Sequence, residues 1–290
     1  MTTDAQPTGL ARRERTGSQK RAIGFETIKR MLPQSGYIAT NGVLPERGFI
    51  ADGMAMGMED SYCDMWTRTE VLSARERSIA TVSLMVGVGN VGNQFELEYH
   101  VPAAYYNGVT LDEIAAIMVH ARAYVGSPAA AWAGQTARQI LNTHGLLENA
   151  EFPKLDLERR EVPGSEKRRI AREVLREMDP GNPLINVSED AIPDDQFAPE
   201  LDYIILENCY FDLWARTDVL DRRSRSIVTL GMLMGLGNHT ALRTHVPIAL
   251  RNGVTEGELA EIVYQAATYL GFPNGVLVRD TVAAGVADTK

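Results

Sequence analysis

The sequence has little cysteine, and its charge is not basic. Of 290 residues only two are cysteines, Cys63 and Cys209, and they stand far apart in no metal-ligand pattern. Two distant cysteines predict neither a disulfide framework nor a zinc site, and they favour a reducing, cytoplasmic setting. The formal net charge is −9, with no basic cluster beyond a short tail. We therefore expect no nucleic-acid partner.

Long hydrophobic runs are also missing. No apolar stretch is long enough to cross a bilayer, and no hydrophobic stretch follows the charges near the N-terminus. We therefore expect no membrane partner and no signal peptide. A composition of 44% hydrophobic and 23% charged residues is typical of a soluble globular protein, and the length allows two domains.

One stretch of the chain is present twice. Residues 72–128 and 220–273 match in register, with residue numbers that differ first by 148 and, from the histidines onward, by 145. Matching pairs include Trp66 with Trp214, Arg77 with Arg225, Gly87 with Gly235, His100 with His245, Tyr124 with Tyr269 and Pro128 with Pro273. Chance does not produce such a register, so the chain is a tandem duplication with three extra residues before the first histidine.

Local signals predict helices throughout. Ser73 with Glu76, and Thr110 with Glu113, form capping boxes that begin helices. An apolar helix is expected over 75–87, followed by one over 93–106 that Pro102 interrupts or restarts. The fold class is therefore all-α, duplicated in tandem.

The duplication also sets the expected domains. Residues 1–20 lack periodic hydrophobics and are expected to be a flexible tail. The first domain spans 21–145 and the second 200–290. The connection over 146–199 contains a charged, exposed helix at 166–178 and a turn-rich segment.

The repeated residues resemble a known family. The pattern R-S-[LI]…G…H-V-x-x-A…N-G-V-T-x-x-E-[LI]…Y-x-G-x-P is similar to that of the carboxymuconolactone decarboxylase family, within the AhpD-like superfamily. The resemblance implies the AhpD-like helical fold. Because single-domain members form rings, commonly hexamers, it also implies a homotrimer whose three tandem chains make a pseudo-hexameric ring.

That superfamily contains two chemistries. The peroxidase branch has a C-x-x-C pair seven and four residues before its histidine, where this chain has Asn93 and Glu96, or Asn238 and Ala241. A dithiol cycle needs two adjacent thiols. The resemblance therefore favours the decarboxylase branch, which uses neither a metal nor another cofactor.

The first copy keeps the decarboxylase motif. Glu96-Leu-Glu-Tyr-His100 resembles the family's E-L-x-x-H, and at helical spacing both side chains lie on one face. A histidine titrates near neutrality and suits proton return to carbon, while the glutamate fixes its tautomer or shares the proton. His245 is the third catalytic candidate, although Ala241 replaces its glutamate.

Other polar residues are candidates for substrate binding. They are Asn90 and Asn93 as oxyanion donors, with His239, Arg243, Ser78 and Ser226. Family decarboxylases tend to have an arginine two residues after the histidine, but this chain has Pro102 and Pro247 there. Arg77 and Arg225 are available instead, although at helix starts they are expected in surface ion pairs.

These residues predict a cofactor-independent carbon–carbon lyase. It decarboxylates a small lactone acid or keto acid through an enolate, with His100 as proton donor and Glu96 as its partner. Three alternatives stay open. One is related enolate chemistry by an isomerase, a cyclase or an elimination enzyme. The others are a thiol-independent peroxidase-like protein and a non-enzymatic ring protein.

Overall fold

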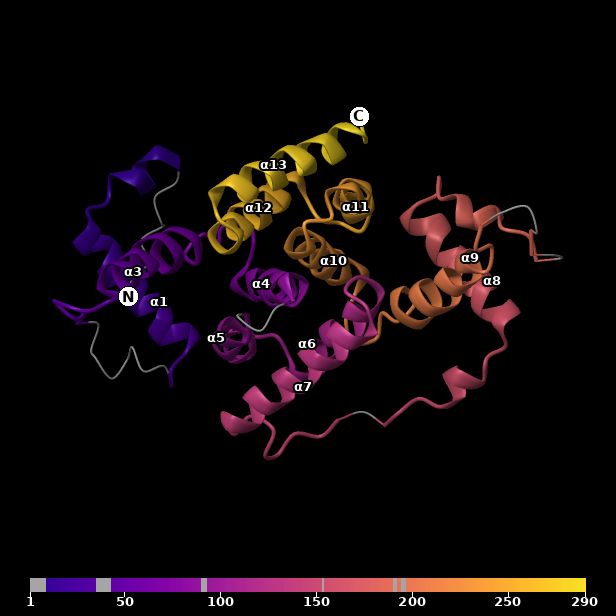
Figure 1. Cartoon of the computed structure of the whole chain (residues 1–290), viewed down its shortest axis with the longest axis horizontal. Coiled ribbons are helices and arrows are strands. Elements are labelled where there is room, and N and C mark those ends of the chain that lie inside the picture. The colour runs from indigo at the N-terminus through magenta and orange to yellow at the C-terminus, as the bar shows by residue number, and fades with distance from the viewer. Residues whose placement is uncertain (1–8, 35–42, 90–92, 153, 190–191, 194–196) are drawn as a thin grey trace.

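Two equivalent helices, one from each copy, pack at the centre of the molecule (Figure 1). They are α4 (Ala74–Val88) and α10 (Arg222–Leu236), and both are buried over most of their length. The computed structural model describes residues 9–34, 43–89, 93–152, 154–189, 192–193 and 197–290. Gly87 and Gly235 allow the two backbones to touch, because a Cβ at either position would collide with the other helix.

The remaining helices repeat around this pair. The first copy contains α3 (Ala51–Met56), the π-helical η2 (Gly57–Met65), α5 (Asn93–Tyr106), α6 (Leu111–His120), the 3-10 turn η3 (Ala121–Ala123) and α7 (Ser127–Thr143). The second contains α9 (Leu201–Ile205), the π-helical η6 (Leu206–Trp214), α11 (His239–Arg251), α12 (Glu256–Leu270) and α13 (Phe272–Ala287). The described residues contain no strand, so the prediction of an all-α duplicated fold is confirmed.

The π-helical segment of each copy, and the tryptophan at its end, pack against the other copy. Trp66 follows η2, and its indole Nε1 donates a 3.0 Å hydrogen bond to the hydroxyl of Tyr269 in α12. Trp214 of η6 makes the same bond, at 2.9 Å, to Tyr124 of the first copy. This exchange places residues of both copies around each histidine.

The helix signals in the sequence are largely confirmed. Both predicted capping boxes form, with Ser73 accepting from the amide of Glu76 and Thr110 from that of Glu113. Gly89 ends α4 in the left-handed conformation that favours glycine. Pro102 does not divide its helix, since α5 continues through it. Within the described residues, no helix is both long and apolar enough to cross a membrane.

The N-terminal region differs from the expected flexible tail. Residues Gly9–Glu14 form a 3-10 helix, and α1 (Gly17–Met31) already begins within the range 1–20. Arg12 is buried and donates to Thr67 at 3.1 Å, while Lys20 pairs with the buried carboxylate of Asp64 at 2.7 Å. A buried carboxylate needs cationic partners, so residues 9–20 are held against η2.

The connection between the copies is also more buried than predicted. It includes the short 3-10 segments η4 (Glu158–Glu161) and η5 (Pro183–Asn186) on either side of α8 (Gly164–Met178). The helix was expected to be exposed, but Ala171, Leu175 and Met178 are buried where it packs on η6. Most of its charged residues lie on the opposite face, as in an amphipathic helix, whereas Arg172 is buried.

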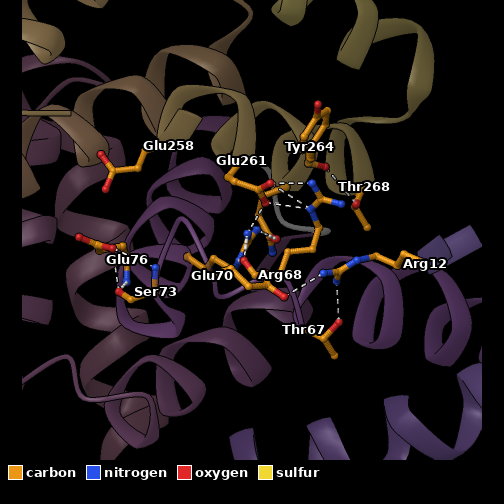
Figure 2. A network of polar contacts seen from close by, with 12 residues as sticks. Arg12, Thr67, Arg68, Glu70, Ser73, Glu76, Glu258, Glu261, Tyr264 and Thr268 are labelled. Carbon is orange, nitrogen blue, oxygen red and sulfur yellow. Dashed lines mark hydrogen bonds and ion pairs between the residues drawn. The ribbon is translucent and has the colours of Figure 1, made fainter. Parts of the chain in front are cut away.

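Two arginines that were expected in surface ion pairs are core residues. Arg77 is 0% exposed and Arg225 is 4% exposed. Arg77 donates to the carboxylate of Glu261. The same carboxylate binds Arg68 in a bidentate pair (Figure 2). Each guanidinium group binds a carbonyl just after a π-helical segment and a side chain from a helix of the other copy, which sequence position alone does not reveal.

Candidate active site

His100 lies in the interior, between the two copies. Its side chain projects from α5 and is 2% exposed. The imidazole stacks on Trp66 with ring centroids 5.6 Å apart and planes 12° from parallel. The edge of Tyr269, from the second copy, contacts it at a centroid distance of 5.1 Å. The ring therefore has a fixed orientation.

Glu96 lies one turn before His100 on the same face of α5. Its Oε2 atom is 3.5 Å from His100 Nε2, and the carboxylate is 41% exposed. The hydrogen bond with His100 lowers the pKa of Glu96 below its usual value. Among the described residues, His100 Nδ1 has no hydrogen-bond partner. A partly solvated carboxylate thus contacts a buried imidazole, which suits proton relay from solvent to an enclosed site.

A cavity of about 320 Å³ opens beside this pair. Its lining comes from both copies: Gly57, Ser61, Tyr62, Met85, Phe95, Glu96, Tyr99, His100, Thr268 and Tyr269. Among these lining residues His100 is the one that can carry positive charge. Burial raises the pKa of Tyr269 well above its usual value, so its phenol stays protonated.

His245 has a different environment. Its Nδ1 lies 2.8 Å from the carbonyl oxygen of Ala241, so Nδ1 carries the proton and donates it. The hydroxyl of Tyr124 is 3.5 Å from Nε2. Burial lowers the pKa of His245, and the position of Glu96 is occupied here by Ala241. This histidine is therefore neutral and bonded to its own helix.

Among the six proposed substrate-binding residues, His239, Arg243, Ser78 and Ser226 do not line the His100 cavity. Asn90 lies outside the described residues, and Asn93 is described only as the first residue of α5. His239 binds Thr281 at 3.1 Å, and Arg243 pairs with Asp288 at the surface.

Ser78 and Ser226 make matching contacts in the two copies. Each hydroxyl donates to the carbonyl four residues earlier and accepts a 3.0 Å bond from an asparagine, Asn107 or Asn252. Because the same two hydrogen bonds form in both copies, we interpret these serines as residues that hold neighbouring helices together.

The aromatic residues around His100 were missed as site residues. Trp66 is 1% exposed and stacks on His100, and Tyr62 lines the cavity, so both residues belong to the site. Tyr269 belongs to the repeated Y-x-G-x-P motif. That motif was a signal for its importance, but only the exchange between copies brings Tyr269 to His100.

Neither thiols nor clustered metal ligands characterise this site. Cys63 is buried, and Cys209 occupies the position equivalent to Ser61 in the other copy. Burial raises the pKa of Cys209 to about 12, so it is a protonated thiol. Across the described ranges, no three His, Cys, Asp or Glu side chains come together as metal ligands.

Comparison with known proteins agrees with this geometry. The model of the carboxymuconolactone decarboxylase family matches residues 60–139 and again 199–279. A 4-carboxymuconolactone decarboxylase of Acinetobacter baylyi is 32% identical over 104 residues, which are 36% of this chain and 72% of that protein. The nitrosuccinic acid decarboxylase of Metarhizium robertsii is 41% identical over 71 residues, 24% of this chain and 49% of that protein. With the family model matched twice around an all-α duplicated core, the chain belongs to the carboxymuconolactone decarboxylase family.

Proposed function

We propose that this protein is a cofactor-independent decarboxylase whose working site is the His100 cavity. Its substrate is a small lactone acid or keto acid that bears one carboxylate beside an electron-withdrawing group. The contact between Glu96 and a buried imidazole supports this reading, because the second copy lacks it. Two relatives are named as decarboxylases, which supports the same reaction class.

The protein must stabilise an enolate and donate a proton to carbon. Cleavage of the carbon–carbon bond releases carbon dioxide and leaves its electron pair on the substrate, delocalised as an enolate. Hydroxyls on the lining, such as that of Tyr269, donate hydrogen bonds to the enolate oxygen. Protonated His100 then donates its proton to carbon. The exposed edge of Glu96 reaches solvent, from which the imidazole regains a proton.

The lining also limits the substrate. A cavity of about 320 Å³ with His100 as its one cationic group offers no second clamp for a dicarboxylate. About half of the wall is apolar, from Met85 and aromatic rings, and about half is polar, from Glu96, His100 and the hydroxyl groups. A compact monocarboxylate with one polar and one apolar side fits these features.

The test is carbon dioxide release from a panel of lactone acids and β-keto acids. We expect His100→Ala to lose about 100-fold or more of the rate, a typical contribution of general acid catalysis. His245→Ala is the matched control and keeps most of it. No release from any acid, or equal loss in both variants, would contradict the proposal. Deuterium incorporation without carbon dioxide release would indicate an isomerase.

We also propose that the chain assembles as a homotrimeric ring. Exposed apolar residues at the start of α13, such as Phe272, Val276 and Leu277, are available for contact with a neighbour. Light scattering on the purified protein tests this: three chains of 31.9 kDa give a mass near 96 kDa. A monomeric mass would contradict it.

A further inference from the structure

Each copy contains a pair of equivalent buried or half-buried arginines, Arg68 with Arg77 and Arg216 with Arg225. Within the part of the chain that the structure describes, only the first pair binds a glutamate. In the first half, Arg77 Nε donates to the carbonyl of Arg68 at 2.9 Å, and both guanidinium groups bind Glu261. Figure 2 shows Arg68 and Glu261 in this network. The carboxylate of Glu261 is 9% exposed, so the core holds one anion between two cations.

The second copy has arginines at both equivalent positions, Arg216 and Arg225. Arg225 Nε donates to the carbonyl of Arg216 at 2.8 Å, which reproduces the bond between the equivalent pair. A further contact is also preserved: Arg77 binds Gln265 at 3.2 Å, and Arg225 binds the equivalent His120 at 3.2 Å. The framework that positions the guanidinium groups is therefore intact.

The carboxylate is the missing member. The residue equivalent to Glu261 in the first copy is Ala116, which has no charge. Within the described residues neither Arg216 nor Arg225 has a carboxylate at ion-pair distance, although Asp218 and Asp221 act on Arg225 from further away. Burial and the neighbouring Arg216 lower the pKa of Arg225 to about 10, which still leaves it charged at neutral pH. A nearly buried cation without a carboxylate is costly, and an anion would relieve that cost.

An open cavity stands where the carboxylate would lie. It measures about 250 Å³, and its lining includes Ala116, Arg216 and Arg225. Three carboxylates, those of Asp112, Asp212 and Asp218, also line it. None of the three forms an ion pair with either arginine among the described residues, so the guanidinium groups keep donors for a ligand.

The rest of the wall is apolar. Val119, Leu213 and Phe152 contribute hydrophobic surface to this cavity. Val119 and Phe152 also line the larger apolar cavity between α6 and α7, of about 690 Å³. The two cavities thus share a wall, so an apolar group attached to a carboxylate has room beside the arginines. None of their residues lines the His100 cavity.

From this internal comparison we infer a second ligand site in the molecule: Arg216 and Arg225 bind the carboxylate of a small apolar carboxylic acid, in the place that the Glu261 side chain occupies in the other half. The site is separate from the His100 cavity and does not depend on the reaction proposed there. We expect the ligand to be a carboxylate because the equivalent two arginines, Arg68 and Arg77, bind the carboxylate of Glu261.

Binding of hexanoate to the full chain tests the site, with hexan-1-ol as a neutral control of similar shape. We expect calorimetric titration to detect hexanoate binding at least 10-fold tighter than that of the alcohol. Ala116→Glu supplies an internal carboxylate, so it should weaken hexanoate binding at least 10-fold and raise Tm by a few degrees. Arg216→Gln should weaken binding equally, while Arg243→Gln, which removes a surface arginine elsewhere, should leave it unchanged.

The reciprocal variant makes the test independent of folding defects in the second half. Glu261→Ala opens the equivalent place beside Arg68 and Arg77, so hexanoate should raise its Tm more than that of the unchanged protein. Hexanoate binding that survives both Ala116→Glu and Arg216→Gln would overturn the inference. Equal affinity for hexan-1-ol, or binding of sulfate but of no carboxylate, would also overturn it.

Discussion

His100 and His245 occupy equivalent positions in the repeat but have different surroundings, which suit different chemistry. Each lies near a tyrosine of the other copy. His100 contacts the carboxylate of Glu96, whereas His245 donates to the carbonyl of Ala241. Burial lowers the pKa of His245, which leaves that ring neutral beside the carbonyl. A single residue one turn away therefore separates a site suited to proton transfer from a structural one.

The buried arginines show a second divergence of the same kind. His245 lacks a glutamate one turn before it, and Arg225 of the same copy lacks a core glutamate, because Ala116 stands where Arg77 has Glu261. The framework of hydrogen bonds is preserved on both sides. Duplicated copies thus keep the contacts that maintain the fold and differ in the charged groups that fill cavities.

The largest effect is expected from removing the core carboxylate. Glu261→Ala leaves the fully buried Arg77 without its partner, and breaking a buried pair costs about 3–5 kcal/mol of the free energy of unfolding. Chemical denaturation measures this change. Glu256→Ala, which removes an exposed carboxylate of the same helix, is the matched control and should change stability by less than about 0.5 kcal/mol. Equal losses in both variants would contradict the burial argument.

The next effect concerns the histidine partner. Glu96→Gln keeps the size of the side chain but removes the charge that contacts His100, so we expect a fall in kcat of about 10- to 100-fold. The matched variant Ala241→Glu places a carboxylate one turn before His245. It should leave the rate of the His100 site unchanged. Comparison of kcat with KM separates a proton-transfer role from substrate binding, and an unchanged kcat in Glu96→Gln would remove Glu96 from the mechanism.

A pH effect is expected from His120, which packs against Arg225 and Thr229 of the second copy. Burial lowers the pKa of His120 well below its usual value of 6.5, so the unfolded chain binds more protons than the folded chain below pH 6.5. Stability therefore falls as the pH drops from 7 to 5, by up to about 2 kcal/mol for a histidine that stays neutral. His120→Gln copies Gln265, which makes the same contacts in the first half.

This substitution should preserve stability at pH 7 and weaken its dependence on pH. Thermal unfolding of both proteins at pH 7 and pH 5 measures the difference. An unchanged loss of Tm on acidification would assign the pH dependence to other groups, including His245, whose pKa is also lowered.

The smallest effects are expected at the paired tryptophans. Trp66→Phe and Trp214→Phe each remove one indole hydrogen bond to a tyrosine hydroxyl, worth about 0.5–1.5 kcal/mol. The stability losses should be similar because the two bonds are equivalent. Only Trp66→Phe should also lower the rate, since Trp66 stacks on His100. A rate loss in Trp214→Phe as large as in Trp66→Phe would contradict the asymmetry of the two sites.

Much of the helical framework could be predicted from local signals. The capping residues Ser73 and Thr110 and the helix-ending Gly89 act within a few residues of chain, so their effects can be read in order. The ordered segment at 9–20 could not be predicted in that way, because its stability comes from Asp64 and Thr67, about fifty residues further on. The burial of Arg77 and Arg225 depends likewise on helices from the other copy.

The sequence by itself determined the duplication, the helices and the inequality of the two histidines, since these follow from residue identity and spacing along one chain. The tertiary structure decided which copy completes which site. Tyr269 reaches His100, and Glu261 reaches Arg77, only because each copy packs its π-helical segment on the other. It also decided that Arg216 and Arg225 enclose a cavity instead of a carboxylate. Contacts between residues more than a hundred positions apart depend on packing and burial, which no local pattern encodes.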